Sequence, residues 1–468
     1  MKKIHLIGIG GTAMATLAAL LRQKGFSVRG SDQNVYPPMS TFLMDERIET
    51  LSGYSRDHIT PDLDLVVVGN AVSRGNPEVE EVLDRKIRYC SLPEAIREHF
   101  LWGARSVVIA GTHGKTTTTS MVAWMLTAAG RDPSMLVGGI AGNFGDDGSS
   151  YRIGAGREFV IEGDEYDSAF FDKTAKFLKY LPDIAVIGNI EFDHADIYAD
   201  LDEIRLAFRR FVNLVPGRGL LLLGADSPEA AAMRAVARSP VETFGLSNGA
   251  DWLGYDLRVA SSGTTFGVRH GQTSFGRFEI PLPGAHNVRN ALAALAVGHA
   301  VGLDAGTLAD GLRRFKGVKR RLEALGTVAG VTVYDDFAHH PTAIAETLRA
   351  LRLAHPSARI RAVFEPRSAS SCRKVFQRAF ADSFGEADDV LIAAVYRASL
   401  PEAERLSVPQ LVADIEAAGR RARYVPAVDD IVALLVEERR EGDQVVLMSN
   451  GGFGGIHAKL LDALRAAG

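Results

Sequence analysis

The chain has 468 residues, a length that favours about three domains of ~150 residues each. With 46% hydrophobic and 24% charged residues, it has the composition of an ordinary globular protein, which excludes a disordered chain. A net charge of −4 gives no electrostatic basis for binding nucleic acid, and a disulfide framework is excluded because the only cysteines are Cys90 and Cys372.

The N-terminal stretch MKKIHLIGIGGTAMATLAALL superficially resembles a signal peptide, since two lysines precede an apolar run. Gly8, Gly10 and Gly11 interrupt that run at the spacing of a strand-to-helix turn, and no stretch of about 20 apolar residues occurs elsewhere. We therefore expect a cytoplasmic protein that acts on small-molecule substrates, with no nucleic-acid or membrane partner. As an assembly we expect a monomer or a weak homodimer.

Short apolar strands alternate with amphipathic helices through the first hundred residues or so. Strands are predicted at residues 4–9, 26–32 and 64–70, and helices at 14–24 and 77–85. The stretch SLPEAIREHFLWGARS is predicted to close the unit as a helix and a connector. Such alternation predicts a parallel α/β sheet. We assign residues 1–103 to a Rossmann-like N-terminal domain.

A new strand, SVVIAG, begins the second unit, and further strands are predicted at residues 159–164, 183–189 and 219–226. Residues 251–280 alternate in polarity between Gly-rich turns, which predicts an antiparallel insertion. The segment PLPGAHNVRNALAALAVGHAVG is predicted to form a helix that stops at Gly302. We assign residues 104–317 to a central P-loop ATPase-like domain.

The basic cluster RRFKGVKRRLE, residues 313–323, marks the next boundary. A charge run of this kind is ordinarily a solvated helix end and linker. Beyond it, strands are predicted at residues 331–337, 360–366, 389–395 and 444–450. Residues 318–468 are therefore assigned to a Rossmann-like C-terminal domain, and the fold class is α/β with three consecutive α/β domains.

The run Gly8-Ile9-Gly10-Gly11-Thr12-Ala13 follows the first strand and fits the pattern G-x-G-x-x-(G/A). Asp32 closes the second strand about twenty residues later. The glycines let the backbone approach a pyrophosphate at a helix N-terminus, and the carboxylate can accept from ribose hydroxyls. The pattern predicts a diphosphate site but leaves its ligand open, because NAD and a nucleotide-sugar satisfy the same geometry.

A shortened phosphate loop, Gly111-Thr112-His113-Gly114-Lys115-Thr116-Thr117, lies between a strand and a helix. The usual signature has a glycine five positions before Gly114, where this chain has Ile109. Backbone N–H groups, one ammonium and the hydroxyls can still cradle triphosphate oxygens and ligate Mg²⁺ through Thr116. A Gly turn with a solvated lysine is the less favoured interpretation, and His113 by itself is interpreted as a loop residue.

Two acidic clusters follow at strand ends of the same unit, EGDEYD at residues 162–167 and EFDHAD at residues 191–196. The carboxyl ends of parallel strands meet beside the phosphate loop, and hard oxygen ligands suit Mg²⁺. An acidic loop alone is usually solvated surface, and a lone histidine is usually structural. Two clusters next to a triphosphate loop instead favour metal and phosphate chemistry.

A diphosphate loop, an ATP-type loop and a third domain together favour an ATP-dependent ligase. Such an enzyme holds one substrate by its nucleotide, activates its carboxylate as an acyl phosphate, and lets an amine brought by the third domain attack. A kinase or simple ATPase does not need the N-terminal diphosphate site. The alternatives are an NAD-dependent oxidoreductase, which rests on the first loop and Asp32, and a nucleotide-binding regulator without chemistry.

These motifs resemble the Mur ligase family, the ATP-dependent amide-bond-forming enzymes of peptidoglycan synthesis, over essentially the whole chain. GTHGKTTT is similar to the compact ATP loop of that family. The resemblance implies that Lys115 contacts the β/γ-phosphates and stabilises the transition state. It implies two Mg²⁺ ions, one held by Thr116 and Glu165 and the second by His194.

Further segments extend the resemblance: HNVRN at residues 286–290, KRRLE at 319–323 and YDDFAHHPT at 334–342. By resemblance, Asn287 and Asn290 face the adenine, and Asp336 binds the ribose. The resemblance also implies that Arg321 reaches the nucleotide when the C-terminal domain closes. The basic linker motivates the hypothesis that this closure occurs about residues 316–321. His339, with its neighbour in the His-His pair, is expected near the nucleotide.

For the UDP-sugar the resemblance implies contacts from the first loop and two further strand ends. The expected residues are Gly8, Gly10, Gly11, Thr12, Asp32 and Asn70. The ATP-binding set is Gly111, Thr112, His113, Gly114, Lys115, Thr116, Thr117, Asn287, Asn290, Arg321 and Asp336. Lys115, Glu165 and His194 are the expected catalytic residues, with ATP as co-substrate and Mg²⁺ as cofactor.

The GIGGTAM and GSD segments resemble family members that take UDP-N-acetylmuramic acid with a free lactyl carboxylate. Two activities fit: addition of L-alanine, and addition of the tripeptide L-alanyl-γ-D-glutamyl-meso-diaminopimelate during cell-wall recycling. GSDQNVYPPMSTFL, GNAVSRGNPEVE and MSNGGFGGIHAKLL resemble the tripeptide-adding branch. The alanine-adding branch would show Q-P-H-R-Y-(S/T)-R where this chain has EPRSASS.

A tripeptide with several carboxylates and an ammonium needs a roomy, polar C-terminal site. Arg367, Asn450 and Gly451 are the expected peptide contacts, because a guanidinium and a Gly-rich backbone can bind carboxylates and peptide groups. The ordinary interpretation of that Gly-rich loop is a tight strand-to-helix turn. The tripeptide-adding branch usually has an EPRSNT-like segment where this chain has EPRSASS, so the residues after Ser368 depart from its pattern.

Overall fold

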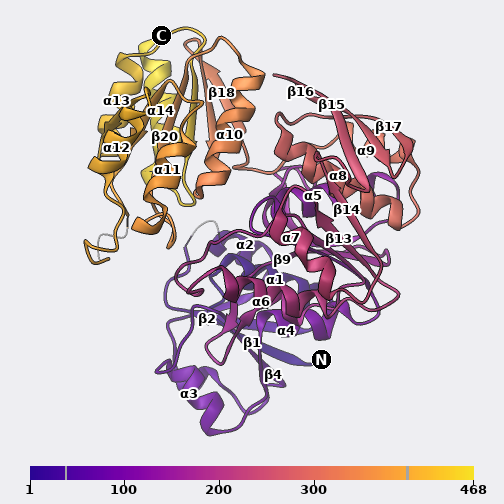
Figure 1. Ribbon diagram of the computed structural model, residues 1–468. Coiled ribbons are helices and arrows are strands. Elements are labelled where there is room, and N and C mark those ends of the chain that lie inside the picture. Colours follow the sequence, from indigo (N-terminus) through magenta and orange to yellow (C-terminus); the bar gives the residue numbers. More distant parts are fainter. Residues whose placement is uncertain (37–38, 397–399) are drawn as a thin grey trace.

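The computed structural model describes residues 1–36, 39–396 and 400–468, which form three consecutive α/β units (Figure 1). In Figure 1 the N-terminal unit is indigo and purple, the central unit runs through magenta to salmon, and the C-terminal unit is orange and yellow. Each unit contains its own sheet flanked by helices. The predicted fold class, three α/β units in series, is confirmed.

The N-terminal sheet is parallel and has the strand order β3-β2-β1-β4-β5. Its strands are β1 (Lys3–Ile7), β2 (Ser27–Asp32), β3 (Glu49–Ser52), β4 (Leu65–Val68) and β5 (Tyr89–Ser91). Its helices are α1 (Thr12–Gln23), α2 (Met39–Asp45), α3 (Pro77–Asp84) and α4 (Leu92–Ile96). The order reverses at β1, so β1, β2 and β4 end at one edge, where open α/β sheets bind ligands.

The central sheet has the order β17-β16-β15-β14-β13-β12-β6-β9-β7-β8. Its parallel middle contains β6 (Arg105–Ala110), β7 (Ser134–Ala141), β9 (Glu158–Gly163), β12 (Ile184–Ile187), β13 (Leu220–Gly224) and β14 (Val241–Gly245). β8 (Ser149–Arg152) pairs antiparallel with β7 at one edge. At the other edge β15 (Trp252–Ala260) pairs parallel with β14, and β16 (Gly263–His270) and β17 (Thr273–Ile280) then add by antiparallel pairing. The antiparallel segment expected at residues 251–280 is therefore present, and it extends the main sheet.

Helices cover the central sheet on both faces, and a small ribbon lies beside it. The helices are α5 (Lys115–Ala128), α6 (Leu201–Val212), α7 (Pro228–Ala232), α8 (Ala285–Ala300) and α9 (Ala305–Arg313), and the ribbon is β10 (Asp167–Ala169) with β11 (Asp172–Ala175). The helix α8 ends just before Gly302, as predicted; this glycine has φ +89°, a conformation that favours glycine at a helix C-terminus.

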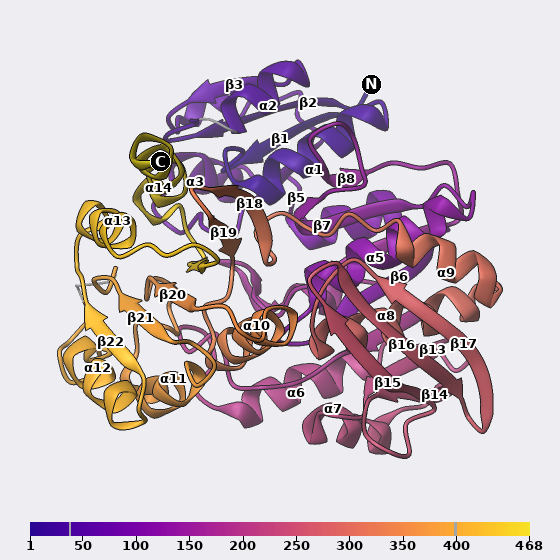
Figure 2. The ribbon, with the colours of Figure 1, turned by 90° about the horizontal axis from the view of Figure 1, so that it is seen from above.

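The C-terminal sheet has the order β18-β19-β23-β20-β21-β22. Its strands are β18 (Glu323–Val328), β19 (Val331–Asp336), β20 (Ile360–Phe364), β21 (Asp389–Ile392), β22 (Arg421–Tyr424) and β23 (Gln444–Met448). Its helices are α10 (Pro341–Ala354), α11 (Gln377–Ser383), α12 (Val408–Ala417), α13 (Val428–Glu437) and α14 (Ile456–Ala467). Seen from above, α10 is the C-terminal helix nearest α8 of the central unit (Figure 2).

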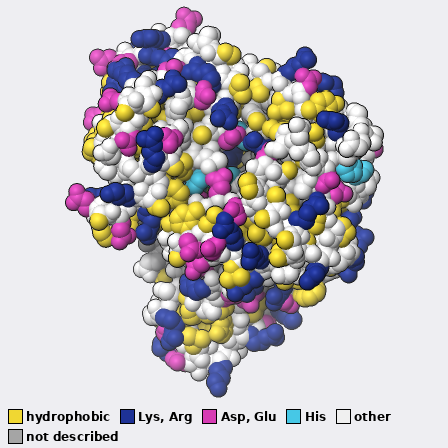
Figure 3. All heavy atoms as spheres, in the orientation of Figure 1, with side chains coloured by type: hydrophobic (Ala, Val, Ile, Leu, Met, Phe, Trp, Pro, Cys, Tyr) yellow, Lys and Arg dark blue, Asp and Glu magenta, His cyan; other side chains and the backbone are white. Residues whose placement is uncertain are grey.

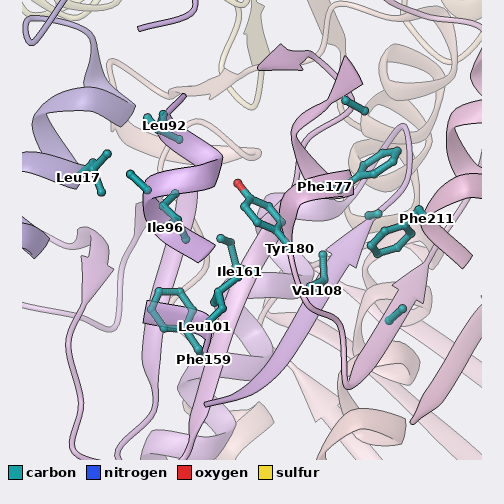
Figure 4. Packing of buried hydrophobic residues seen from close by; sticks show 14 of the residues in the cluster. Leu17, Leu92, Ile96, Leu101, Val108, Phe159, Ile161, Phe177, Tyr180 and Phe211 are labelled. Carbon is teal, nitrogen blue, oxygen red and sulfur yellow. The ribbon is translucent and has the colours of Figure 1, made fainter. Parts of the chain in front are cut away.

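Alternating side chains of β6 place the central sheet between two hydrophobic clusters. Val107 and Ile109 pack with α5, α8 and α9, whereas Val108 and Ala110 join a cluster shared with the N-terminal unit. Figure 4 shows part of the shared cluster, including Leu17 of α1, Ile96 of α4 and Val108 of β6. This shared core fixes the first unit against the sheet that carries the ATP-type loop.

None of the helices within the described residues is both long and apolar enough to span a membrane. The predicted closing helix of the first unit is α4 followed by a π-turn at Arg97–Leu101. The basic cluster at residues 313–323 is only partly solvated: Arg313 is exposed, but Arg320 and Arg321 turn inward and make side-chain hydrogen bonds. This inward turn brings the basic linker between the central and C-terminal units into contact with the candidate site.

Candidate active site

The ATP-type loop connects the carboxyl end of β6 to α5, whose first residue is Lys115. Gly114 caps the helix with φ +79°, a left-handed conformation that favours glycine. A Cβ at Gly114 would also collide with the side-chain amide of Asn290 on α8. The loop therefore presents backbone N–H groups at a helix N-terminus, where an anion binds favourably.

Lys115 lies folded back into this loop, and its ammonium donates to the carbonyl oxygens of Gly111 at 2.7 Å and Thr112 at 3.2 Å. Its Nζ is also 2.8 Å from Oε2 of Glu165, which follows β9 and is almost fully buried. Burial opposes the charged form, but the carboxylates of Glu165, Asp164 and Glu162 outweigh it and raise the pKa of Lys115. The sequence-predicted pair Lys115 and Glu165 is thus in direct contact.

His194, which lies beyond the end of β12, completes a chain of three predicted residues. Its Nε2 is 3.3 Å from Oε1 of Glu165, so that Glu165 links the histidine to Lys115. Burial opposes protonation, but Glu165 and Asp193 outweigh it and raise the pKa of His194. The backbone at His194 has φ +55°, which is uncommon for a residue other than glycine and is typical of functional positions.

Glu162, the second-last residue of β9, is a site residue that we did not predict individually. Its Oε1 accepts a hydrogen bond of 3.1 Å from Thr116 Oγ1, and its Oε2 accepts one of 2.7 Å from the Gly138 amide. Burial raises the pKa of Glu162. Thr116, Glu162 and Glu165 together offer a hydroxyl and two carboxylates, the hard oxygen donors that Mg²⁺ prefers.

Arg321 connects the C-terminal unit to the ATP-type loop. Its Nη2 donates to Thr116 Oγ1 over 3.3 Å. The flanking residues Arg320 and Leu322 have φ values of +62° and +51°, so Arg321 lies in a strained segment of backbone. Asp336, at the end of β19, holds that segment because its Oδ2 accepts from the Leu322 amide at 2.6 Å.

The predicted nucleotide residues on α8 and β19 lie next to the loop but already have protein partners. Asn290 Nδ2 donates to Asn287 Oδ1 at 3.3 Å, and Asn287 Nδ2 donates to the Pro283 carbonyl at 2.9 Å. The second Asp336 oxygen accepts from the Ala338 amide at 2.7 Å. This geometry gives Asp336 a clear supporting role for Arg321, while its ribose contact stays a prediction.

A second cluster joins the central and C-terminal units beside the loop, and Figure 3 shows histidine and acidic side chains at the boundary between these units. Glu191 accepts from Thr342 Oγ1 at 2.6 Å and lies 3.4 Å from His113 Nε2. The His340 ring bonds to the Phe192 carbonyl at 3.1 Å, and His339 lies 4.0 Å from Asp193. Ligand atoms of His113, Glu191 and His340 lie within 4.8 Å of one another.

Internal hydrogen bonding satisfies this second cluster without an ion. Burial opposes the charge of Glu191, but the hydrogen bonds from His113 and Thr342 outweigh it and lower the pKa of Glu191 to about 2. Burial lowers the pKa of His340 to about 4, so that it is neutral at pH 7, and its Nδ1 accepts from the Thr342 amide. Glu191 and Thr342 therefore form a hydrogen-bonded link between the segment that follows β12 and the first turn of α10.

Replacing Thr342 with valine is expected to lower kcat about tenfold, because a hydrogen bond to a charged group across the two units is lost at nearly constant side-chain volume. Steady-state turnover measures the effect. Thr342→Ser keeps the hydroxyl and serves as the matched control, for which we expect near-normal turnover. Equal activity of the valine and serine variants would contradict a role for this link in the active conformation.

The diphosphate loop of the N-terminal unit lies at the carboxyl edge of β1. The amides of Gly8 and Ile9 donate to the Ser31 carbonyl at 2.8 and 3.0 Å, and the Gly10 amide donates to Asp32 Oδ2 at 2.8 Å. Gly11 and Thr12 are exposed at the start of α1, where they can meet a ligand. Asn70, just beyond β4, follows a neighbouring strand of the same sheet.

The three predicted peptide-binding residues are neighbours at the carboxyl edge of the C-terminal sheet. Arg367 packs against Gly451, and its guanidinium lies 3.7 Å from the centroid of the Tyr396 ring. Asn450 Oδ1 is buried without a hydrogen-bond partner among the described residues. The neighbouring Arg320 holds the loop by donating to the Gly451 carbonyl at 2.7 Å.

The structure thus brings one group of the predicted residues into contact, and two other groups of predicted residues lie apart from it. Lys115, Thr116, Glu165, His194 and Arg321 form a connected network across two units. Within the described residues, the N-terminal diphosphate loop and the three residues Arg367, Asn450 and Gly451 make no side-chain hydrogen bond or ion pair with that network. They lie apart from the network and flank it along the chain.

Comparison with known proteins gives matches along most of the chain. The family descriptions "Mur ligase family, catalytic domain", "Mur ligase middle domain" and "Mur ligase, glutamate ligase domain" match residues 3–101, 109–298 and 320–451. The UDP-N-acetylmuramate–L-alanyl-γ-D-glutamyl-meso-2,6-diaminoheptandioate ligase of Escherichia coli (strain K12) is 42% identical over 465 residues, which is 99% of this chain and 98% of the relative.

Two further relatives are similar to this chain over nearly its whole length. The crystal structure of a murein peptide ligase from Psychrobacter arcticus 273-4 superposes with a TM-score of 0.72 at 36% identity, covering 99% of both chains. A UDP-N-acetylmuramate–L-alanine ligase from Chelativorans sp. (strain BNC1) is 36% identical over 456 residues, covering 96% of this chain and 95% of the relative. The similarity therefore extends through all three units to ligases of both substrate types.

Proposed function

This chain belongs to the Mur ligase family, and we propose that it joins the tripeptide L-alanyl-γ-D-glutamyl-meso-diaminopimelate to UDP-N-acetylmuramate in peptidoglycan recycling. It is an ATP-dependent amide-bond-forming ligase. The observation that supports the chemistry best is the contact of Arg321, from the linker to the C-terminal unit, with Thr116 beside the Lys115–Glu165 pair. The NAD-dependent oxidoreductase alternative has no comparable support.

In the proposed reaction, ATP phosphorylates the lactyl carboxylate of UDP-N-acetylmuramate, and the L-alanyl amine then attacks the acyl phosphate. The tetrahedral adduct collapses to the amide and releases phosphate, with ADP as the other product. Lys115 and the loop amides hold and neutralise the phosphates, and Arg321 adds a second cation from the C-terminal unit. Contact between the units excludes the water that would otherwise hydrolyse the acyl phosphate.

Mg²⁺ fits the donor set around the loop. We propose that Thr116 and Glu165, with Glu162 beside them, hold one ion and that His194 contributes to a second. When bound, Mg²⁺ neutralises phosphate charge. Glu165 accepts from Lys115 and lies beside His194, so this carboxylate also keeps the lysine oriented toward the loop.

Each unit has a proposed task along the reaction. Residues 1–103 bind the UDP-sugar through the first loop, residues 104–317 bind ATP, and residues 318–468 bind the peptide. Arg367, Asn450 and Gly451 support the last assignment, because a stacked guanidinium and a buried unpaired amide oxygen offer complementary contacts to peptide carboxylate and ammonium groups. We propose that the enzyme works in the cytoplasm as a monomer or a weak homodimer.

With ATP and UDP-N-acetylmuramate supplied, we expect the tripeptide to give a kcat/KM more than about 100-fold above that of free L-alanine. The reason is that a polar site built for several charged groups loses most of its interactions with a small amino acid. Product formation and phosphate release measure the preference. A higher kcat/KM for L-alanine would instead support the alternative of an L-alanine ligase of de novo peptidoglycan synthesis.

A further inference from the structure

A fully buried carboxylate lies behind the diphosphate loop of the N-terminal unit and takes no part in the proposed chemistry. Glu78, near the start of α3, has a side-chain exposure of 0%. Its Oε2 accepts from Ser31 Oγ at 2.5 Å and lies 3.1 Å from His5 Nε2, while its Oε1 lies 2.6 Å from His58 Nδ1. The Ser55 amide also donates to Oε1, over 3.3 Å.

These contacts keep Glu78 ionised inside the unit. Burial opposes the charge, but the hydrogen bonds from His5 and Ser31 outweigh it and lower the pKa of Glu78. The two strands that provide these donors, β1 and β2, are adjacent in the sheet. A buried charge of this kind is costly unless all its partners are in place, so its presence fixes the positions of the side chains around it.

Ser31 connects the buried carboxylate to the diphosphate loop. Its hydroxyl donates to Glu78, and its own carbonyl oxygen accepts from the amides of Gly8 and Ile9. The next residue, Asp32, accepts from the Gly10 amide. The course of the loop backbone therefore depends on where the Ser31–Asp32 segment lies. The sheet holds the Ser31 backbone between β1 and β3, and Glu78 accepts the hydrogen bond of its side chain.

We propose that Glu78 is a positioning residue for the UDP-sugar, acting through Ser31 on the loop amides without touching the ligand. The proposal rests on the proposed function, because it assumes that this loop binds the UDP-sugar diphosphate. An amide in place of the carboxylate changes the charge and turns one acceptor into a donor facing Ser31. The loop is then free to depart from the geometry that suits the diphosphate.

The test measures KM for UDP-N-acetylmuramate and for ATP separately, together with direct calorimetric binding of UDP-N-acetylmuramate. For Glu78→Gln and for the milder Ser31→Ala we expect KM for UDP-N-acetylmuramate to rise about tenfold, with KM for ATP and kcat within twofold of the unchanged enzyme. Glu80→Gln, on the exposed side of the same helix where Glu80 bonds Arg74, is the matched control and should leave both KM values unchanged.

The double variant Ser31→Ala/Glu78→Gln should raise KM for UDP-N-acetylmuramate no further than Glu78→Gln alone, since the serine transmits the effect. Thermal unfolding measurements establish whether each variant is folded. If Glu78→Gln does not fold, the Ser31→Ala variant tests the proposal. Unchanged KM for UDP-N-acetylmuramate in a folded Ser31→Ala variant, or an equal rise in KM for ATP, would overturn the proposal. Failure of the unchanged enzyme to bind UDP-N-acetylmuramate would instead overturn the proposed function.

Discussion

Lys115→Met is expected to lower kcat at least about 10³-fold while the chain stays folded. The methionine keeps the length of the aliphatic stem but removes the ammonium, the cation in the first turn of α5 that can neutralise phosphate charge directly. Because Lys115 Nζ also donates to the carbonyls of Gly111 and Thr112, the variant loses part of the loop's internal hydrogen bonding. Single-turnover measurement of ADP formation isolates the phosphoryl-transfer step.

Loss of this lysine leaves a buried carboxylate behind, and the effect on stability has to be separated from the effect on chemistry. Glu165 keeps His194 at 3.3 Å as a second partner, so we expect a limited decrease in the thermal midpoint. Lys179→Met is the matched control: Lys179 is similarly shielded and pairs with Asp172, and within the described residues its ammonium makes no ion pair with the ATP-type loop. Near-normal turnover of Lys115→Met, or an equal loss in Lys179→Met, would refute the proposed role of Lys115.

The buried elements of the fold could be predicted because their sequences are locally distinctive. The strand β6 reads as an apolar run and is buried on both faces of the sheet, and the glycines after it mark the turn. Short polar strands have no such distinctive sequence and could not be predicted. β3 has the sequence ETLS and is largely exposed, so no apolar alternation distinguishes it from a loop.

Site residues can be predicted from the sequence where they belong to one local motif. They cannot be predicted where side chains from distant segments of the chain meet. Lys115 and Thr116 belong to one loop and were identified from it. Glu162 lies in a predicted acidic cluster, but the sequence does not tell which carboxylate of that cluster turns toward Thr116. The link between Glu191 and Thr342 depends on how two units pack together, which no local pattern encodes.

The inward position of Arg321 shows how tertiary contacts can override the ordinary meaning of a charge run. A basic linker is usually solvated, but here Arg320 and Leu322 adopt positive φ values that a flexible solvated chain would not retain. Asp336 stabilises this conformation through the Leu322 amide, and the Phe337 amide donates to the Arg320 carbonyl at 2.8 Å. The residues at and just after the end of β19 thus hold the linker in this conformation.

Arg321→Ala is accordingly expected to lower kcat about 10²- to 10³-fold, the effect of removing one cation that stabilises transferring phosphate. Lys319→Ala is the matched control, since Lys319 is an exposed cation in the same linker whose side chain has no partner at the site among the residues that the structure describes. Arg321→Lys should recover only part of the activity, because an ammonium cannot reproduce the planar fork of a guanidinium. Turnover at saturating substrates measures all three variants.

Scattering separates the chemical role of Arg321 from its role in bringing the units together. We expect MgATP and UDP-N-acetylmuramate together to reduce the radius of gyration of the unchanged protein, because phosphate bound beside Thr116 would attract Arg321 and its linker. In Arg321→Ala the compaction should be smaller, since bound phosphate no longer attracts the linker. Absence of compaction in the unchanged protein would refute closure about residues 316–321, and full compaction of an inactive Arg321→Ala variant would assign the arginine to chemistry alone.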